Sequence, residues 1–371
     1  MLIAGGGVAA LEAAVALTEL AGERAAVTLL APEREFLYRP MTVLEPFSGP
    51  LAGRWPLAQL ASRIGVASCP QALSWIDPRA RLAHTSQGEA LAYDALLLAV
   101  GARRYARFRY ATTIDDRRLD DQLHGLVEDV EQGYTRSVAF LVPSRVPWPL
   151  AVYELALMTA ERALQMNVDV VVSIVTPERA PLEALGEQAS RAVARRLQRC
   201  GVELHLDSRC EVIAPGRVRL GSGQRELVAA RLIALPELAG PSIGGVPRSA
   251  TGGFIRIDRR CAVVGLERVW AAGDAVDFPV KLGGLAAQQA EVAATAIAAL
   301  AGAPLPVAPL QPHVEVVLLG GGAPLHLSAE LIGRRPTHSR AETQPRWPAT
   351  RKIAAPRLAV LLDALDGAPA R

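Results

Sequence analysis

Apolar and polar positions at the start of the chain follow the order of a strand, a helix and a second strand. Leu2 to Ala4 form a short apolar run, residues 8–20 place apolar side chains with helical spacing, and Val27 to Leu30 form a second apolar run. A glycine triplet, residues 5–7, separates the first run from the helical segment. This pattern predicts a βαβ unit that opens with a glycine-rich turn.

The rest of the chain repeats this alternation. The apolar run YDALLLAVG ends in Gly101, as expected for a buried strand that closes over the first unit. Further on, residues with helical spacing alternate with Val- and Ile-rich runs that indicate covered parallel strands. The predicted helices span 115–132, 150–164, 183–200, about 284–301 and 352–365, and the predicted strands span 137–142, 168–175 and 202–206. The pattern therefore predicts two α/β units followed by a smaller tail.

The first turn reads Gly5-x-Gly7-x-x-Ala10, a spacing with a physical meaning. Gly5 permits the tight turn, Gly7 lets the backbone approach a pyrophosphate, and Ala10 lets the helix pack closely on the strand. Free N–H groups and the positive dipole end of the helix would bind the phosphates. Glu33, just past the second strand, is the candidate for the ribose hydroxyls. The alternative for this apolar start is a secretory signal. It is disfavoured, because no basic region precedes the apolar run and two glutamates interrupt it.

The corresponding turn of the second unit differs. Residues 142–150 read VPSRVPWPL, where glycines are expected. Prolines remove the N–H donors that a phosphate needs, and Trp148 adds bulk where the backbone should approach a ligand. Pro149 suits the first position of a helix. We therefore expect a Rossmann-like domain whose dinucleotide site is lost or altered.

Composition and charge limit the classes of function. A net charge of +3 on 371 residues is too small to indicate a nucleic-acid partner. Four widely spaced cysteines without a CxxC pair suit reduced thiols in the cytoplasm, and we expect no metal site. No uncharged apolar run is long enough to span a bilayer.

A set of motifs in order carries a family resemblance. It consists of GGGVAALEA, YRP, YDALLLAVGA, VYELA, VWAAGDAVDFPVKLGG and AAQQA. Together they resemble the FAD-dependent pyridine nucleotide-disulfide oxidoreductase superfamily, in the branch of type II NADH dehydrogenases and sulfide:quinone oxidoreductases. The resemblance covers roughly residues 1–302.

The resemblance implies an α/β fold with two Rossmann-like dinucleotide-binding domains. In it the FAD-binding domain is discontinuous, since the second domain is inserted into it. Residues 1–110 would form the first part of the FAD-binding domain and residues 236–305 its second part. Residues 111–235 would form the degenerate NAD(P)-type domain, and residues 306–371 a C-terminal interface or membrane-surface segment.

The resemblance also implies FAD as the cofactor and a set of residues around it. Tyr38 to Pro40 would run beside the flavin, Gly101 would lie near the adenosine, and Asp274 would accept from a ribityl hydroxyl. The helix from Gly284 and the nearby Lys281 would stabilise negative charge on the reduced flavin. The implied cofactor-binding residues are Gly5, Gly7, Val8, Ala9, Ala10, Glu33, Arg34, Arg39, Pro40, Gly101, Gly273, Asp274, Lys281, Gly284 and Leu285.

Two residues are candidates for catalysis. Glu154 matches a glutamate that type II NADH dehydrogenases carry near the flavin and quinone, and its alternative is an acid favoured by the helix dipole. Lys281 is the second, and its alternative is a solvated surface cation. Asp274 likewise has a structural alternative, a turn cap after a strand.

Departures from the family pattern affect the electron donor and acceptor. The segments 35–48 and 144–153, which hold redox cysteines in related enzymes, contain none here, so thiol chemistry is disfavoured. Gln288 and Gln289 match a quinone signature, whereas Gly284 replaces its earlier glutamine.

We therefore predict an FAD-dependent oxidoreductase that passes two electrons from a reductant through flavin to a quinone or another acceptor. The donor stays open between NAD(P)H in an altered pocket and a small reductant such as sulfide. The alternative is a flavin-binding protein without turnover, in a regulatory or assembly role.

The C-terminal helix predicted over 352–365 has three alternatives. It could dock on the protein, pair two subunits of a homodimer, or lie on the inner face of a membrane. In the last case Arg351, Lys352 and Arg357 would contact lipid headgroups. Asp363 and Asp366 favour the first two alternatives, because anionic lipid would repel them.

Overall fold

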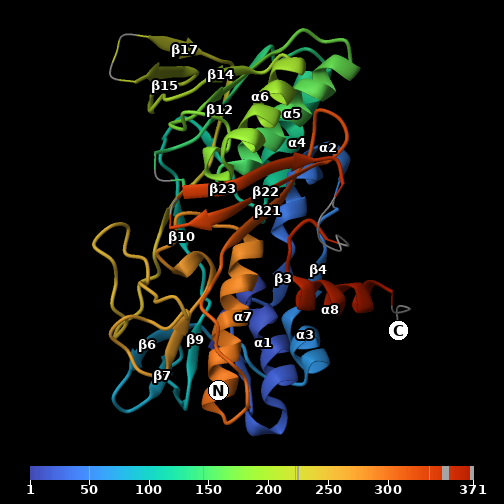
Figure 1. The fold of residues 1–371 in the computed structure, drawn as a ribbon. Helices are drawn as coiled ribbons and strands as arrows, with labels where there is room; N and C mark the ends of the chain where they lie inside the picture. The colour runs from blue at the N-terminus through green and yellow to red at the C-terminus, as the bar shows by residue number, and fades with distance from the viewer. Residues whose placement is uncertain are drawn as a thin grey trace.

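The computed structural model describes residues 1–49, 51–144, 146–221, 223, 225–333, 335–344 and 351–367. Two parallel sheets, each with helices packed against it, form two halves of the molecule (Figure 1). A three-stranded antiparallel sheet near the C-terminus crosses between the halves. The structure confirms the predicted α/β fold class with two Rossmann-like units.

The first sheet has five parallel strands in the order β20-β9-β1-β2-β5. Its strands are β1 (Leu2–Ala4), β2 (Thr28–Leu30), β5 (Ala67–Cys69), β9 (Leu96–Leu98) and β20 (Val269–Ala271). Leu96 of β9 pairs with both Leu2 of β1 and Val269 of β20. The chain thus leaves this sheet after β9 and returns to its edge much later.

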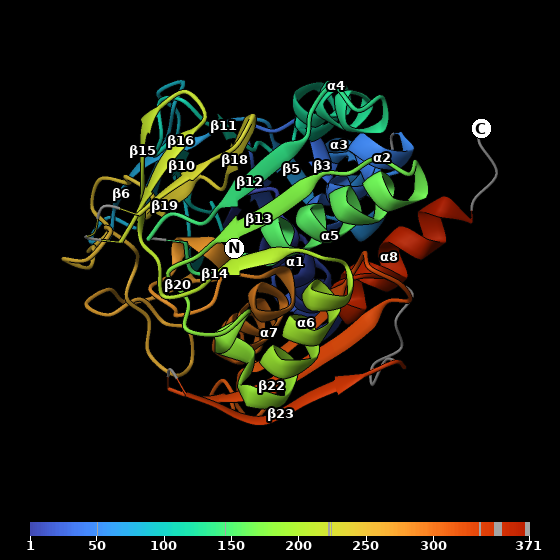
Figure 2. The same cartoon turned by 90° about the horizontal axis from the view of Figure 1, so that it is seen from above.

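Two alanine-rich helices pack side by side on this sheet, α1 (Val8–Ala21) and α7 (Gly283–Leu300). Alanines are fully buried along both helices, because small side chains let the two backbones lie close together. Figure 2 shows the same pair end-on beneath the second sheet. The N-termini of both helices consequently lie at the same end of the first sheet.

The second sheet also has five parallel strands, in the order β11-β18-β12-β13-β14. Its strands are β11 (Thr112–Thr113), β12 (Ser137–Leu141), β13 (Val171–Val175), β14 (Glu203–His205) and β18 (Arg231–Ala234), with helices α4 (Leu119–Glu131), α5 (Leu150–Gln165) and α6 (Glu187–Arg199). The strands β12 and β13 are buried along almost their whole length, as their Val- and Ile-rich sequence predicts.

Shorter elements connect and extend the two sheets. The chain segments that link the halves pair as an antiparallel ribbon of β10 (Arg103–Tyr105) and β19 (Glu237–Ala239). The remaining elements are η1 (Gly22–Arg24), β3 (Glu35–Leu37), η2 (Arg39–Leu44), α2 (Glu45–Ser48), β4 (Arg54–Pro56), α3 (Leu57–Ile64), β6 (Leu73–Asp77), β7 (Leu82–Thr85), β8 (Ala90–Ala92), η3 (Glu183–Leu185), β15 (Cys210–Ala214), β16 (Arg217–Leu220), β17 (Glu226–Val228) and η4 (Gly273–Ala275). The domain limits stay a prediction. The sheets support it, because strands from residues 1–110 and 236–305 share the first sheet and strands from residues 111–235 form the second.

Four predictions at helix starts were wrong. In the helix predicted from residue 183, the first residues form the separate turn η3, and α6 begins at Glu187. The helix predicted from residue 115 begins at Leu119, because Asp115 forms a turn in which its side chain accepts the N–H of Arg117. Pro149 is the N-cap of α5 rather than its first residue. The helix predicted from residue 352 begins at Pro356, since Ile353 is extended and bridges to β21.

The C-terminal part consists of β21 (His313–Leu318), β22 (Leu325–Ile332), β23 (Arg335–Glu342) and α8 (Pro356–Asp366). The strand β23 packs on α6 and β21 packs on α7, which ties the two halves together. The helix α8 packs against α1 and buries Leu358 and Leu362. Within the described part of the chain, no helix has both the length and the apolar character to cross a bilayer.

The basic residues near α8 are paired within the chain. Arg351 binds two aspartates of α8, Lys352 binds Glu154, and Arg357 binds Glu19 and Glu291. The headgroup contacts expected of a membrane-surface helix are therefore wrong for Lys352, which is buried. Docking on the protein is the alternative that the contacts of α8 support, and pairing between subunits stays a prediction.

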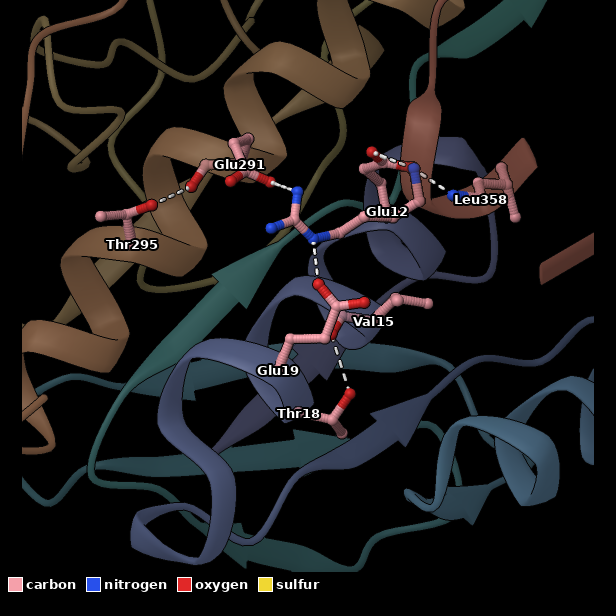
Figure 3. A network of polar contacts seen from close by, with 8 residues as sticks. Glu12, Val15, Thr18, Glu19, Glu291, Thr295 and Leu358 are labelled. Carbon is pink, nitrogen blue, oxygen red and sulfur yellow. Dashed lines mark hydrogen bonds and ion pairs between the residues drawn. The ribbon is translucent and has the colours of Figure 1, made fainter. Parts of the chain in front are cut away.

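A carboxylate from α1 caps α8. The buried side chain of Glu12 accepts the backbone N–H groups of Arg357 and Leu358, at 3.2 and 2.7 Å. Glu19 and Glu291 surround the same point (Figure 3), where they bind the Arg357 guanidinium. Burial raises the pKa of Glu12, and these N–H groups oppose that shift.

Replacing Glu12 by alanine should lower the free energy of unfolding by about 1–3 kcal/mol, because two N–H groups lose their acceptor. Glu19→Ala is the matched control, since Glu19 is exposed and a surface ion pair contributes about 1 kcal/mol or less. Urea unfolding of both variants measures the difference. Equal losses would contradict the capping role of Glu12.

Candidate functional site

A cavity of about 600 Å³ lies where the two halves and the C-terminal segment meet. Its wall includes the glycine turn before α1, the helix η2, the first turn of α5, the start of α7, and Lys352 and Ile353. Elements far apart in the sequence thus form one cleft.

The glycine turn has two different environments. Gly5 has φ +127°, and a Cβ atom there would lie 2.2 Å from the carbonyl oxygen of Ala99, so only glycine fits. Gly7 is the N-cap of α1 without a side-chain cap, and a Cβ atom there would meet nothing within 4 Å. The N-terminus of α1 therefore presents free N–H groups to open space in the cleft.

Glu33 carries an unpartnered buried oxygen. Its Oε2 atom is buried without a hydrogen-bond partner in the described structure, and its Oε1 atom lies 3.8 Å from the Arg117 guanidinium. A buried carboxylate oxygen without a donor is costly unless a ligand supplies one. Hydroxyl groups of a ribose are donors of the right kind.

Arginines add positive charge to this end of the cleft. Arg39, Arg104 and Arg117 all line it, and Arg104 is paired with Asp116 at 2.6 Å. Burial lowers the pKa of Arg39, and the neighbouring Arg104 lowers it further. An anionic group such as a diphosphate would relieve that repulsion.

Gly273 and Asp274 lie just after β20 in the helical turn η4, and both line the cleft. The Gly273 N–H donates to the Gln289 side chain at 2.8 Å. Lys281 donates to the backbone carbonyls of Asp274 and Val276. These contacts fix the turn that carries the Asp274 side chain.

Lys281 is 8% exposed, so its alternative as a solvated surface cation is wrong. Its ammonium lies 3.9 Å from the centre of the Phe254 ring, and burial lowers its pKa to about 8. The carbonyl contacts show that its ammonium supports the η4 turn.

Glu154 and Lys352 form a buried ion pair in the wall of the cleft. Their atoms Oε1 and Nζ are 2.7 Å apart, and the two side chains are 1% and 6% exposed. Lys352 also donates to the carbonyl of Pro40 at 2.7 Å, and Glu154 accepts the N–H of Leu319 at 3.0 Å. Burial raises the pKa of Glu154, although Lys352 opposes the shift.

The segment that delivers Lys352 is held on both sides. Ile353 donates its N–H to the hydroxyl of Tyr38 at 2.9 Å and bridges to Val316 of β21. Burial raises the pKa of Tyr38 to about 12, so its hydroxyl stays protonated. No sequence pattern indicated that Lys352 would line the cleft, because its partner Glu154 lies 198 positions away.

The cleft gathers most of the predicted site residues. Gly5, Gly7, Val8, Ala9, Glu33, Arg34, Arg39, Pro40, Gly101, Gly273, Asp274, Lys281 and Glu154 line it. Ala10, Gly284 and Leu285 are buried outside its lining. Ala10 packs α1 on the sheet, whereas α7 starts at Gly283, so Gly283 takes the lining place expected of Gly284.

The two glutamines of the half-kept quinone signature are used inside the protein. Gln288 exchanges two hydrogen bonds with the backbone of His313, at 2.8 and 2.9 Å. Gln289 binds Gly273, as described above. Neither residue lines the cleft as the structure describes it.

Residues 153–299 match the sequence profile of the family "Pyridine nucleotide-disulphide oxidoreductase". This stretch of the chain is therefore similar to that family. A search of curated proteins by sequence returned no match.

Solved structures show the same fold. The sulfide:quinone oxidoreductase from Aquifex aeolicus has a TM-score of 0.81 at 17% identity, over 98% of this chain and 90% of that one. A ferredoxin reductase for the CYP199A2 system from Rhodopseudomonas palustris has a TM-score of 0.63 at 18% identity, over 89% of this chain and 82% of that one. The NAD-dependent persulfide reductase from A. fulgidus has a TM-score of 0.64 at 16% identity, over 88% and 63%.

FAD is the cofactor that the sequence resemblance implies, and the residues of the cleft fit it. The open space at Gly7, the unpartnered oxygen of Glu33 and the exposed N-terminus of α1 match a diphosphate joined to a ribose. The cofactor predicted from the sequence is thereby confirmed at the level of the superfamily.

Proposed function

We propose that the protein is an FAD-dependent oxidoreductase that passes two electrons from a reductant to a quinone or another acceptor. The buried pair of Glu154 and Lys352 carries this proposal, because it places a charged acid and base in the cleft that fits the flavin.

Each part of the cleft then has a role. The N-terminus of α1 and Gly7 hold the diphosphate, Glu33 accepts from the ribose hydroxyls, and Asp274 accepts from a ribityl hydroxyl. The segment from Tyr38 to Pro40 runs beside the ring system, and the N-terminus of α7 faces its pyrimidine end. When bound, FAD supplies the two-electron chemistry.

Glu154 and Lys352 serve charge and proton transfer. Lys352 holds a positive charge at its Nζ atom beside the backbone of Pro40, where it would stabilise negative charge that forms during reduction. Glu154, whose pKa burial raises, can hold a proton at Oε1 or Oε2 and pass it to an acceptor that takes up protons with electrons. Lys352 replaces Lys281 as the principal cation in this proposal.

Thiol chemistry has no place in the proposal. Cys69, Cys200, Cys210 and Cys261 are all free and none lines the cleft as described. Burial raises the pKa of each thiol, to about 12 for Cys210 and Cys261, so none is activated as a thiolate.

An apolar wall beside the ion pair supports a quinone-like acceptor. Val146 and Trp148 of the altered turn and Val316 and Val317 of β21 all line the cleft. A flat, neutral ring with polar oxygens suits such a wall next to one charged pair. The name of the Aquifex enzyme, sulfide:quinone oxidoreductase, agrees with this class of acceptor.

Anaerobic mixing of the FAD-loaded protein with sulfide, NADH and NADPH in turn tests the proposal. We expect one small donor to bleach the visible flavin band and a water-soluble quinone to restore it. Glu154→Gln should slow reoxidation by about 10²-fold or more, the range for loss of a general acid. Glu128→Gln, at an exposed site, is the control.

Bleaching by dithionite alone, with no donor active and no effect of a quinone, would contradict this proposal. It would favour the alternative of a flavin-binding protein without turnover.

A further inference from the structure

The second Rossmann-like unit contains a place that corresponds to the dinucleotide site of other such units. In such units the diphosphate lies over the turn between the first strand and first helix, and an acid at the end of the second strand binds the ribose. Here that turn is the segment between β12 and α5, and that acid is Glu178, three residues after β13.

The turn offers few donors. Residues 142–149 include three prolines, at positions 143, 147 and 149, and Pro149 is the N-cap of α5. Since proline has no N–H, the turn and the N-cap of α5 lack three of the donors that a phosphate could use. Val146 and Trp148 face the flavin cleft instead.

The acid is already occupied. The hydroxyl of Tyr153 donates to Glu178 Oε2 at 2.6 Å, and Thr176 donates to the same atom at 3.1 Å. The N–H of Glu183 donates to Oε1 at 3.2 Å. Both carboxylate oxygens of Glu178 therefore have partners, and one of them, Tyr153, is a fully buried side chain of α5.

The two units of this chain contrast directly. In the first unit, Gly7 faces open space and Glu33 has an oxygen without a partner. In the second, prolines fill the turn and Tyr153 holds the acid. A ribose at Glu178 would have to displace a short hydrogen bond from a side chain that cannot reach water.

We propose that the second unit excludes pyridine nucleotides, with Tyr153 and the proline-rich turn as its specificity-determining residues. The electron donor is then a species other than NADH or NADPH, a consequence that rests on the proposed function. The binding specificity itself does not depend on turnover.

Equilibrium dialysis of the FAD-loaded protein against NADH and NADPH tests binding directly. We expect no saturable binding below about 1 mM. Anaerobic mixing adds a second readout: dithionite should bleach the flavin, and neither nucleotide should. Saturable binding tighter than about 1 mM, or bleaching by either nucleotide, would overturn the inference.

The converse test uses a variant in which the turn loses a proline and its tryptophan, and in which Glu178 loses the hydroxyl group that binds it. Pro147→Gly, Trp148→Ala and Tyr153→Phe together should strengthen NADH binding by at least about tenfold over the native protein. Tyr134→Phe, at an exposed position, is the control. If the triple variant keeps its FAD and does not bind NADH more tightly, these residues do not determine the specificity. If the triple variant does not fold, the dialysis experiment on the native protein still tests whether the second unit excludes NADH and NADPH.

Failure of this inference is distinguishable from failure of the proposed function. A protein that binds NADH and turns over contradicts only the exclusion. A protein that excludes both nucleotides but reacts with no donor contradicts only the proposed function.

Discussion

Replacement of Lys352 by methionine is expected to lower the free energy of unfolding by about 3–5 kcal/mol at pH 8, the range for a buried ion pair that loses one partner. The methionine side chain fills much of the space of the lysine stem. It leaves Glu154 as a buried carboxylate whose remaining donor is the N–H of Leu319. The loss therefore comes from an uncompensated charge and only slightly from packing.

The loss should depend on pH in a definite direction. Burial already raises the pKa of Glu154 above the ordinary value of 4.5, and removal of Lys352 raises it further. Between pH 4.5 and the folded-state pKa, the folded protein binds a proton that the unfolded chain does not bind. The free energy of unfolding therefore falls as pH rises through this window, and the variant is least stable above it.

Urea unfolding at pH 5 and pH 8 measures both effects. The double variant Lys352→Met with Glu154→Gln should recover most of the loss at pH 8, because it removes the charge as well as its partner. Arg191→Met, which breaks an exposed pair with Glu187, should cost about 1 kcal/mol or less at either pH. A loss that is the same at both pH values, or a double variant as unstable as the single one, would contradict the buried pair.

The fold was predictable where local patterns decide it. The glycine turn, the Val- and Ile-rich strands and the alanine-rich helices each follow from their own sequence, and the structure has all of them. The errors concern element ends and the strands β22 and β23, which the sequence analysis did not predict. Two helix starts are displaced. The turn at Asp115 depends on its own side chain, which accepts the N–H of Arg117, whereas the bridge of Ile353 to Val316 depends on a strand that is distant in the sequence.

The site was predictable on the side of the first unit and not on the opposite side. Gly5, Gly7 and Glu33 belong to one short motif, so their convergence follows from the sequence. Lys352 enters the cleft only because β21 and Tyr38 position the extended segment before α8. No local pattern encodes that contact.

The role of the altered turn shows the same division. Sequence reasoning identified the loss of donors at the prolines, since that is a property of each residue. It did not find that Tyr153 holds Glu178, because the two side chains belong to different elements of the second unit. The sequence showed only that the glycine motif of the second unit is missing, whereas the tertiary structure shows that Tyr153 binds the acid of that unit.

Gly5→Ala is expected to lower the free energy of unfolding of the FAD-free protein by about 3 kcal/mol or more, whereas Gly7→Ala should change it by about 1 kcal/mol or less. At Gly5 two costs add. A φ of +127° strains an alanine, and its Cβ atom would lie 2.2 Å from the Ala99 oxygen at the end of β9, so the backbone must shift. At Gly7 the backbone φ is −93° and a Cβ atom meets nothing within 4 Å.

The affinity for FAD should respond in a different way to the same pair of variants. The open space at Gly7 is where the diphosphate would lie, so a methyl group there should weaken FAD binding by about tenfold or more while the protein stays folded, a cost of about 1.4 kcal/mol. Thermal unfolding without flavin and titration with FAD separate the two effects. If Gly7→Ala binds FAD as tightly as the native protein, the diphosphate does not lie over the start of α1, and the orientation of the cofactor in the cleft must be reversed or displaced.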